Sequence, residues 1–312
     1  MNSATSPLVS IGIPTYNRAD RNLRKVIERA LGQSYKHIEV IVSDNCSSDH
    51  TPELVGTFDD PRLRYIRQER NIGPNNNFNF CLNQARGEYF LLFHDDDMID
   101  EDFVYSCIAA LAPGESVGAI FTGVRIIDEH DHVLWEYQNR AAGLPAAEFI
   151  LGWFDGRVSL YLCSTLYNTA KLKAAGGFHS AKGLFDDLVP TFTLVAREGR
   201  CDVAAVKASF RRHSGSGGSA VPVSSWIEDS HYLLDTIYAL FPQQRELLEK
   251  RGTRYFCRKM YWYASARADL GQRLRDYAQI YRSFGYSYSP VAYLLDRARG
   301  RLAAGGKRLL GR

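Results

Sequence analysis

The sequence predicts an α/β fold in which a parallel β-sheet is covered by helices on both faces. Three features of the first hundred residues support this prediction. Short runs rich in Val, Ile, Leu and aromatic residues recur, apolar residues at helical spacing separate them, and Pro, Gly, Asn or Asp residues bound each run. Strands that alternate with helices in this way form βαβ units, whose strands lie parallel in one sheet.

Residues 8–13 are the first predicted strand, which we expect Pro14 to stop. Leu23, Val26 and Ile27 follow at helical spacing and predict the first helix, and residues 38–42 predict the second strand.

A polar loop over residues 44–49 leads to Thr51 and Pro52, where we expect a second helix, because proline is tolerated in a first helical turn. Residues 63–66 are a short third strand. A helix then carries Phe78, Leu82 and Ala85, and residues 88–93 are the fourth strand.

The middle of the chain predicts further strands. Residues 117–121 form one, and residues 124–128 with 133–135 form a hairpin around His130 and His132. We interpret these two histidines as solvated turn residues rather than as metal ligands.

Three consecutive carboxylates, Asp95, Asp96 and Asp97, follow His94 directly after the fourth strand. Such a cluster repels itself unless a positive charge is held beside it. Mg²⁺ or Mn²⁺ takes a few carboxylate oxygens and fills its other positions with phosphate and water, so a cation that bridges to a substrate diphosphate is one interpretation. The alternative is a solvated acidic turn at the start of a helix near Asp100.

Two blocks of motifs carry a family resemblance. The first comprises residues 13–18, the strand end at 42–45, residues 70–73 with Asn77, residues 85–89 and the acidic run at 95–97. The second comprises residues 185–187, Arg197 with Gly199, and residues 210–216. In this order and spacing they resemble a family 2 glycosyltransferase of the GT-A fold, of the bacterial polysaccharide or O-antigen type, over about residues 7–217. The chain departs from the family in carrying His94 where Asp is frequent and Asp186 where Glu is frequent.

The resemblance implies a GT-A domain over residues 1–220, with a Rossmann-like mixed sheet flanked by helices. Its nucleotide-sugar half covers about residues 1–100 and its acceptor half about residues 101–220. Residues 221–312 are then a basic helical C-terminal appendage.

The resemblance also implies site residues. Asp44 is expected at the nucleobase, Thr15, Tyr16 and Asn17 around base and ribose, and Arg18 at a phosphate. The expected nucleotide-sugar contacts as a whole are Pro14, Thr15, Tyr16, Asn17, Arg18, Asp44, Asn45, Asn71, Gly73, Asn77, Asp95 and Asp96.

Asp97 is the first expected ligand of Mn²⁺ or Mg²⁺, with Asp95 and His213 as further ligands. Asp187 is the expected general base for the acceptor hydroxyl, and Asp186 is its nearest rival. One base without a carboxylate nucleophile implies inversion at the anomeric carbon. The alternative places both acids at a helix start, where they stabilise the helix dipole. Trp153 and Tyr161 are either core residues or stack on a sugar face.

The composition supports an enzyme of the cytoplasm. The chain has 312 residues, 45% of them hydrophobic, and six cysteines at irregular spacings, which favours reduced thiols over disulfides or zinc. The first six residues lack the basic start and apolar segment of a secretion signal, and no apolar run is long enough to span a bilayer.

The charge is concentrated near the C-terminus. Residues 251–312 contain 14 Lys or Arg against three Asp, a net charge of +11, which leaves −8 for the remainder of a chain with +3 overall. A basic, aromatic-rich helical segment favours an anionic membrane surface on the inner face of the plasma membrane. The alternative is a homo-oligomer formed through these helices; nucleic acid is a weaker choice, because no binding motif accompanies the charge.

The sequence therefore predicts a metal-dependent, inverting glycosyltransferase that moves a sugar from a nucleotide-diphosphate donor to a saccharide or lipid-linked glycan acceptor. Two alternatives stay open. One is a catalytically silent, carbohydrate-binding GT-A scaffold of a biosynthetic complex. The other is a sugar-nucleotide pyrophosphorylase, although the glycine-rich, basic N-terminal loop of such enzymes is missing here.

Overall fold

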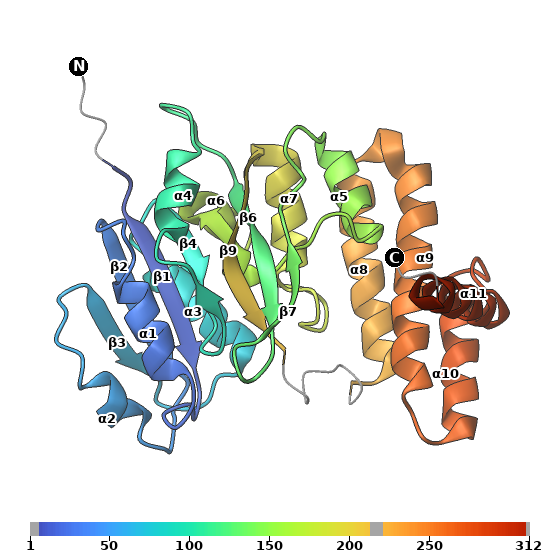
Figure 1. The fold of residues 1–312 in the computed structure, drawn as a ribbon, viewed down its shortest axis with the longest axis horizontal. Helices are drawn as coiled ribbons and strands as arrows, with labels where there is room; N and C mark the ends of the chain where they lie inside the picture. The colour runs from blue at the N-terminus through green and yellow to red at the C-terminus, as the bar shows by residue number, and fades with distance from the viewer. Residues whose placement is uncertain (1–5, 213–220, 310–312) are drawn as a thin grey trace. The chain divides into compact units, whose positions relative to one another are not determined.

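The computed structural model describes residues 6–212 and 221–309. The chain divides into two compact units, residues 1–215 and 216–312. The first unit contains a nine-stranded sheet with helices, and the described part of the second contains helices only (Figure 1).

The first four strands follow the predicted order. They and their helices are β1 (Val9–Thr15), α1 (Leu23–Leu31), β2 (Ile38–Asp44), α2 (Thr51–Val55), β3 (Leu63–Arg67), α3 (Pro74–Gln84) and β4 (Tyr89–Leu92). β1 pairs in parallel with β2 and with β4, and β2 pairs in parallel with β3. The parallel βαβ half of the sheet is therefore confirmed, with the strand order β3-β2-β1-β4.

Pro14 does not stop β1, contrary to the prediction. The strand continues to Thr15, and Pro14 lies opposite Ser43 of β2. The Gly12 carbonyl accepts a hydrogen bond from the Phe93 amide on the β4 side, so the next donor on that side would be residue 14. Proline has no N–H, and therefore only the β1–β4 ladder ends there, whereas pairing with β2 continues.

The second half of the sheet is mixed. Its elements are β5 (Met98–Ile99), α4 (Phe103–Ala109), β6 (Ala119–Ile127), β7 (Val133–Tyr137), α5 (Ala146–Phe154), the 3₁₀ turn η1 (Leu162–Ser164), β8 (Thr165–Asn168), α6 (Thr169–Ala174), α7 (Leu188–Glu198) and β9 (Arg200–Arg211). β8 is antiparallel to both β4 and β6, β9 is parallel to β6, and β5 and β7 are antiparallel additions to β9 and β6. This is the mixed sheet that the family resemblance implied.

β6 is one continuous strand, whereas the sequence predicted two, over residues 117–121 and 124–128. Gly123, which resembles a break, instead allows close packing. A Cβ at this position would lie 2.6 Å from the Tyr137 carbonyl oxygen and 2.9 Å from the Val206 side chain. The glycine therefore marks an approach of β7 and β9 to β6 and does not end the strand.

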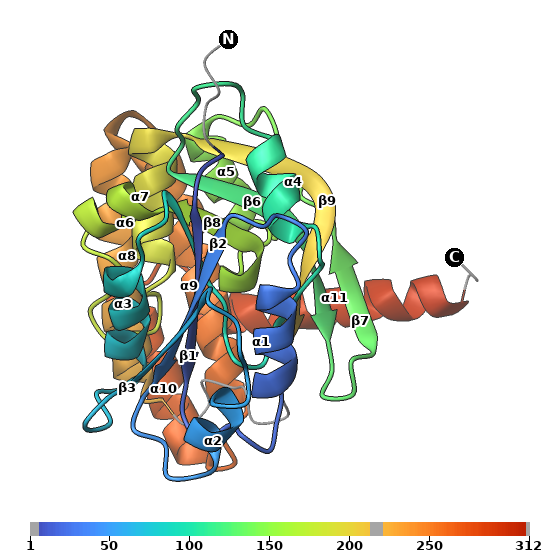
Figure 2. The same cartoon turned by 90° about the vertical axis from the view of Figure 1, so that its left-hand side faces the viewer.

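Helices cover both faces of the sheet, as Figure 2 shows. Alternate residues of β1, such as Ile11 and Ile13, share a buried cluster with Val26 of α1 and Phe103 of α4. On the opposite face, a Cβ at Gly12 would lie 2.8 Å from the Cys81 side chain, so α3 packs directly on the strand. Trp153 is also core, because it is buried and meets the Phe192 ring edge-on at 5.4 Å.

The second unit is a group of helices. They are α8 (Val223–Leu240), the 3₁₀ turn η3 (Pro242–Gln244), α9 (Arg245–Ser265), α10 (Leu270–Ser283) and α11 (Pro290–Leu309). Tyr261 is buried and donates a hydrogen bond to the Tyr288 carbonyl at 3.0 Å. Trp262, Leu270 and Leu274 are exposed. No helix in the described residues is both long and apolar enough to cross a membrane.

Candidate active site

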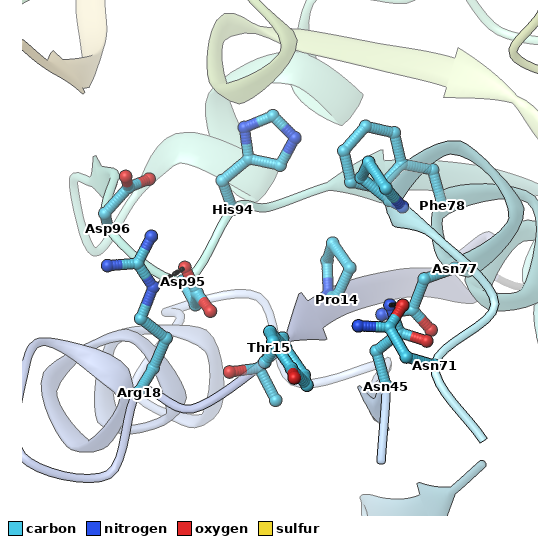
Figure 3. Close-up of a pocket in the computed structure, with 12 residues that line it drawn as sticks. Pro14, Thr15, Arg18, Asn45, Asn71, Asn77, Phe78, His94, Asp95 and Asp96 are labelled. Atoms are coloured by element: carbon cyan, nitrogen blue, oxygen red, sulfur yellow. Dashed lines mark hydrogen bonds and ion pairs between the residues drawn. The ribbon is translucent and has the colours of Figure 1, made fainter. Parts of the chain in front are cut away.

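A pocket of about 390 Å³ opens where β1 and β4 separate beyond Pro14 (Figure 3). The order β3-β2-β1-β4 reverses direction at this pair, and open α/β sheets bind ligands where such a reversal leaves a crevice. The volume lies in the range of small-molecule sites. The pocket is lined by Pro14, Thr15, Tyr16, Arg18, Asn45, Asn71, Pro74, Asn77, Phe78, His94, Asp95 and Asp96.

Most of these residues were expected to contact a nucleotide sugar. Asn17, Asp44 and Gly73 were also expected, but they do not line the pocket. Pro74, Phe78 and His94 line it and were not predicted as contacts. The ring centroids of Phe78 and His94 lie 5.0 Å apart, a tertiary contact that no sequence motif predicts.

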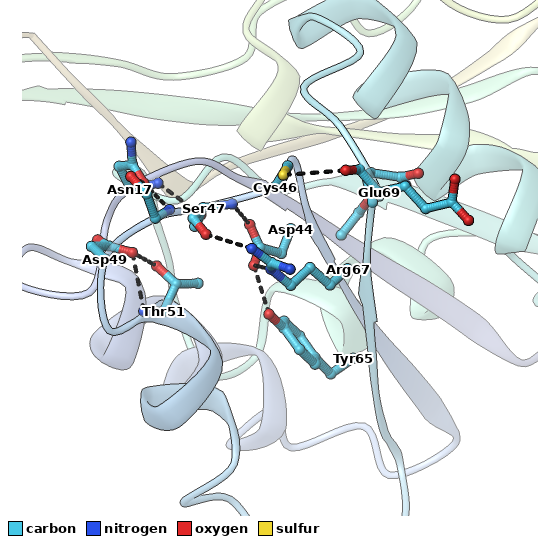
Figure 4. A network of polar contacts seen from close by, with 12 residues as sticks. Asn17, Asp44, Cys46, Ser47, Asp49, Thr51, Tyr65, Arg67 and Glu69 are labelled. Carbon is cyan, nitrogen blue, oxygen red and sulfur yellow. Dashed lines mark hydrogen bonds and ion pairs between the residues drawn. The ribbon is translucent and has the colours of Figure 1, made fainter.

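Asn17 joins the loops that follow β1 and β2. Its backbone φ of 54° lies in the left-handed region, which asparagine tolerates better than most residues. Its amide N–H donates to the Ser47 hydroxyl at 2.9 Å, and its side-chain oxygen accepts from the Ser48 amide at 2.8 Å (Figure 4). Asn17 therefore shapes the loop that carries Tyr16 and Arg18.

Asp44 is fully buried at the end of β2. Its carboxylate accepts hydrogen bonds from the Ser47 amide at 2.8 Å and from the Tyr65 hydroxyl at 2.6 Å, with the Arg67 guanidinium 3.6 Å away (Figure 4). Burial, followed by the hydrogen bond to this carboxylate, raises the pKa of Tyr65, so the phenol stays a donor. In this structure Asp44 stabilises the loop after β2 through these hydrogen bonds.

Amide side chains form one end of the pocket (Figure 3). The Asn45 amide donates to the Asn71 side-chain oxygen at 2.9 Å, and the same oxygen accepts from the Gly73 amide at 2.9 Å. Asn77 is buried and exchanges hydrogen bonds with the hydroxyl and the carbonyl of Ser43. Gly73 precedes α3 with φ of 85°, a conformation that side chains with a Cβ rarely adopt.

Charged side chains form the other end (Figure 3). The Arg18 guanidinium lies 3.6 Å from the Asp95 carboxylate. Burial raises the pKa of Asp95 to about 6, although the charge of Arg18 acts in the opposite direction. Asp95 therefore faces the loop after β1.

His94, Asp96 and Asp97 form the one group of candidate metal ligands found among the described residues. Their ligand atoms all lie within 4.8 Å of one another. Asp95, expected as a ligand, is not in this group, and His94, which was not expected, is. His213, the third expected ligand, lies outside the described residues.

The electrostatics of this group fit a divalent cation. Burial and the neighbouring Asp96 carboxylate raise the pKa of Asp97 well above its usual range, as expected where carboxylates converge without a compensating charge. Burial lowers the pKa of His94, which favours the neutral imidazole that binds metals. The buried Nε2 atom of His94 has no hydrogen-bond partner within the described part of the chain. Carboxylates with one imidazole suit a cation such as Mn²⁺ that also accepts phosphate oxygens.

Arg211 holds the acidic turn in place from the end of β9. Its side chain is almost fully buried, and its Nε and Nη1 atoms each donate at 2.7 Å, to the carbonyls of Asp96 and Asp128. Its backbone amide donates to the Asp97 carboxylate at 2.9 Å. The buried Arg211 guanidinium thus fixes the backbone of Asp96, and the Arg211 backbone amide orients the Asp97 carboxylate.

Asp186 and Asp187 lie outside the pocket lining, in the segment that leads into α7. Asp187 occupies the N-cap position and its side chain makes no capping hydrogen bond, so any contribution of Asp187 to the helix comes from its charge at the positive end of the helix dipole. The preceding segment is fastened to α3, because Asn79 accepts from the Phe178 amide and donates to its carbonyl. The acids are therefore carried on a segment that packs against the same helix that supplies Asn77 and Phe78 to the pocket.

The chain is similar to several known proteins. The family model "Glycosyl transferase family 2" matches residues 10–188. A curated relative is the GalNAc(5)-diNAcBac-PP-undecaprenol beta-1,3-glucosyltransferase of Campylobacter jejuni, 42% identical over 171 residues, which are 52% of this chain and 54% of that one. The chain spans about half the length, or less, of the first curated relatives it matches.

Two solved structures share the fold. Residues 1–349 of TarS from S. aureus, in complex with UDP-GlcNAc, align with a TM-score of 0.67 at 16% identity, covering 88% of this chain and 81% of that one. The mannosyltransferase PcManGT from Pyrobaculum calidifontis, in complex with GDP-Man and Mn²⁺, aligns with a TM-score of 0.57 at 18% identity, covering 96% and 81%.

Proposed function

This chain belongs to glycosyl transferase family 2, and from that premise we propose that it moves a sugar from a nucleotide-diphosphate donor to a hydroxyl of a saccharide or lipid-linked glycan. The observation that carries the proposal is the convergence of His94, Asp96 and Asp97, of which His94 and Asp96 line a pocket of about 390 Å³.

The two ends of the pocket match the two ends of such a donor. A nucleobase presents hydrogen-bonding edges, which the amides of Asn45 and Asn71 can complement. A diphosphate presents negative charge, which requires a cation beside Asp96 and Asp97. Arg18, already within 3.6 Å of Asp95, adds a guanidinium for a phosphate oxygen. The bound donors of TarS and PcManGT, UDP-GlcNAc and GDP-Man, support this class of ligand.

We propose His94, Asp96 and Asp97 as the residues that hold Mn²⁺ or Mg²⁺, with His213 as a further candidate. A divalent ion at this place neutralises the charge of a departing nucleoside diphosphate. Arg211 keeps Asp97 oriented toward that place, and Asp95 keeps Arg18 at the rim.

Asp187 is the proposed general base, with Asp186 as its rival. The carboxylate takes the proton of the acceptor hydroxyl while the hydroxyl oxygen bonds to the anomeric carbon and the bond from that carbon to the diphosphate oxygen breaks. One displacement from the face opposite the leaving group inverts the anomeric configuration. The proton remains on the carboxylate until it exchanges with water.

We propose that the C-terminal helices bring the enzyme to an anionic membrane surface, where a lipid-linked acceptor would lie. Val291, Leu294 and Leu295 of α11 are exposed in a segment of high positive charge. Tyr293 of the same helix is buried against Tyr261, with ring centroids 5.3 Å apart.

A panel of UDP-, GDP- and dTDP-sugars tests the proposal. We expect one donor to raise the melting temperature only when Mn²⁺ or Mg²⁺ is present, since a ligand at a hundredfold its Kd stabilises a protein by about 2.7 kcal/mol. The same donor should be consumed slowly alone and faster with acceptor. Donor binding without consumption under any condition would favour the silent scaffold.

A further inference from the structure

The β6–β7 hairpin exposes large apolar side chains close to the acidic turn. All five residues of β7 are exposed, among them Trp135 at 50% and Tyr137 at 41%. β7 pairs only with β6 among the described strands, so its outer edge is open. Exposed aromatic residues gathered on one strand mark an interaction site more often than an ordinary surface.

Trp135 and Tyr137 lie on the same face of the sheet as the end of β9. Trp135 is opposite Ile126 on β6, which is opposite Phe210 on β9. Residues opposite one another in neighbouring strands point to the same face, and residues two apart on one strand do so as well. The Phe210 ring in turn packs on Tyr161, with centroids 4.6 Å apart.

This row of aromatic side chains extends toward Asp97, one of the proposed metal ligands. Arg212 places its guanidinium 6.0 Å from the centre of the Trp135 ring, and it directly follows Arg211, whose amide binds Asp97. Burial raises the pKa of the Tyr161 hydroxyl, and the nearby ionisable side chains of Tyr137 and Asp97 raise it further by smaller amounts. We call Trp135, Tyr137, Tyr161, Phe210 and Arg212 the aromatic shelf.

We propose that the aromatic shelf binds the sugar rings of the acceptor, an inference that rests on the proposed glycosyl transfer. The faces of a pyranose ring present C–H groups that pack on aromatic rings, and its hydroxyls accept hydrogen bonds from a guanidinium. Rigid aromatic side chains give such contact area at a low cost in conformational entropy. The exposed Trp135 and Tyr137 provide the ring faces, and Arg212 provides the donor.

The space beyond Tyr137 suits a chain of several sugars. A second pocket of about 400 Å³ is lined by Tyr137 together with Arg140 and Arg157. A saccharide lying on the shelf would reach the acidic turn with one end and this pocket with the other. The acidic turn is the proposed place of the donor diphosphate, so continuity with it favours an acceptor over a membrane or a second copy of the chain, neither of which has to reach the donor.

An array of immobilised oligosaccharides of neutral and acidic hexoses and N-acetylhexosamines tests this inference on the full chain. Trp135→Ala and Tyr137→Ala should each weaken binding about tenfold, whereas Trp135→Phe should retain most of it. Tyr105→Ala is the matched control, because Tyr105 is also an exposed aromatic residue, at 59%, and lies on α4 outside the shelf. It should bind like the unchanged protein.

Unchanged binding in the Trp135→Ala/Tyr137→Ala double variant, or no binding by the unchanged protein, would overturn the inference. Loss of liposome flotation or a change in sedimentation in that variant, with glycan binding intact, would assign the shelf to a membrane or to a second copy. Nucleotide-sugar consumption is measured in parallel. Its absence from the unchanged protein counts against the proposed transfer, whereas the array result concerns the shelf alone.

Discussion

The acidic turn after β4 and the β6–β7 hairpin are neighbours with opposite construction. In the turn, Asp97 is buried. Its carboxylate accepts a hydrogen bond from the Arg211 backbone amide, and the carbonyl of Asp96 accepts one from the Arg211 guanidinium. In the hairpin, Trp135 and Tyr137 face solvent. Arg211 binds the backbone of both regions, at Asp96 and at Asp128, whereas the next residue, Arg212, lies 6.0 Å from the centre of the Trp135 ring. In the proposed function, the buried turn serves the donor and its metal, and the exposed hairpin serves the acceptor.

The largest expected effect on activity comes from a substitution in the acidic turn. Asp97→Asn keeps the shape of the side chain but removes its charge, and we expect turnover to fall below detection while the protein stays folded. Rates of nucleotide-sugar consumption with saturating Mn²⁺ measure the loss. Asp102→Asn, a carboxylate paired with Lys207 outside the turn, is the control and should stay active. Full activity of the unchanged protein in excess EDTA would contradict the role of the cation.

The second effect separates the two acids of the 186–187 pair. Asp187→Asn should lower kcat by about a hundredfold or more and leave donor affinity nearly intact, because a general base acts in the transition state and does not hold the nucleotide. Asp186→Asn should change kcat less. An equal or greater loss from Asp186→Asn alone would move the role of base to that residue.

The third effect compares the adjacent arginines directly. Arg211→Lys should lower the free energy of unfolding by about 2 kcal/mol, since lysine cannot serve both carbonyls of the buried site. Arg212→Lys, at an exposed position, should change it by less than about 0.5 kcal/mol. Urea unfolding of both variants measures the difference, and equal values would remove the contrast between the buried and the exposed arginine.

The smallest effect on chemistry comes from the C-terminal helices. Leu294→Ser/Leu295→Ser changes two exposed positions of α11 and spares the buried Tyr293, so the fold should survive. We expect weaker flotation with anionic liposomes and unchanged transfer to a soluble acceptor analogue. High salt should weaken flotation of the unchanged protein, because each basic residue near an anionic leaflet contributes about 1 kcal/mol of screened attraction.

Removal of residues 300–312 tests the charge of the same helix without touching Tyr293. Four arginines and lysines of this segment, Arg301, Lys307, Arg308 and Arg312, are lost. Flotation that persists in both variants would favour oligomerisation through these helices, which sedimentation of the same proteins would reveal.

The spacing of apolar residues, and the Pro, Gly, Asn and Asp residues that bound each run, were enough to predict the parallel half of the sheet. The strands β1 to β4 are short apolar runs whose ends coincide with polar loops, so local pattern and tertiary position agree. The same logic failed at Pro14 and Gly123, since both look like breaks. Whether such a residue ends a strand depends on which neighbour its backbone faces, and only the assembled sheet decides that.

The candidate site was predictable where residues adjacent in the chain act together. The loop of Thr15, Tyr16 and Arg18 does line the pocket. His94 was not predicted as part of the acidic group, because the direction of each side chain in the 94–97 turn depends on contacts with Arg18, Phe78 and Arg211 from distant segments.

Isothermal titration of nucleoside diphosphates into the protein tests the central claim most directly, because it requires neither the donor sugar nor the acceptor. With Mn²⁺ present, UDP or GDP should bind the unchanged protein and release heat that reports one site per chain. The same titration should show at least tenfold weaker binding in EDTA and in Asp97→Asn. Equal affinity in all three titrations, or binding that depends on Mn²⁺ but survives intact in Asp97→Asn, would contradict the account.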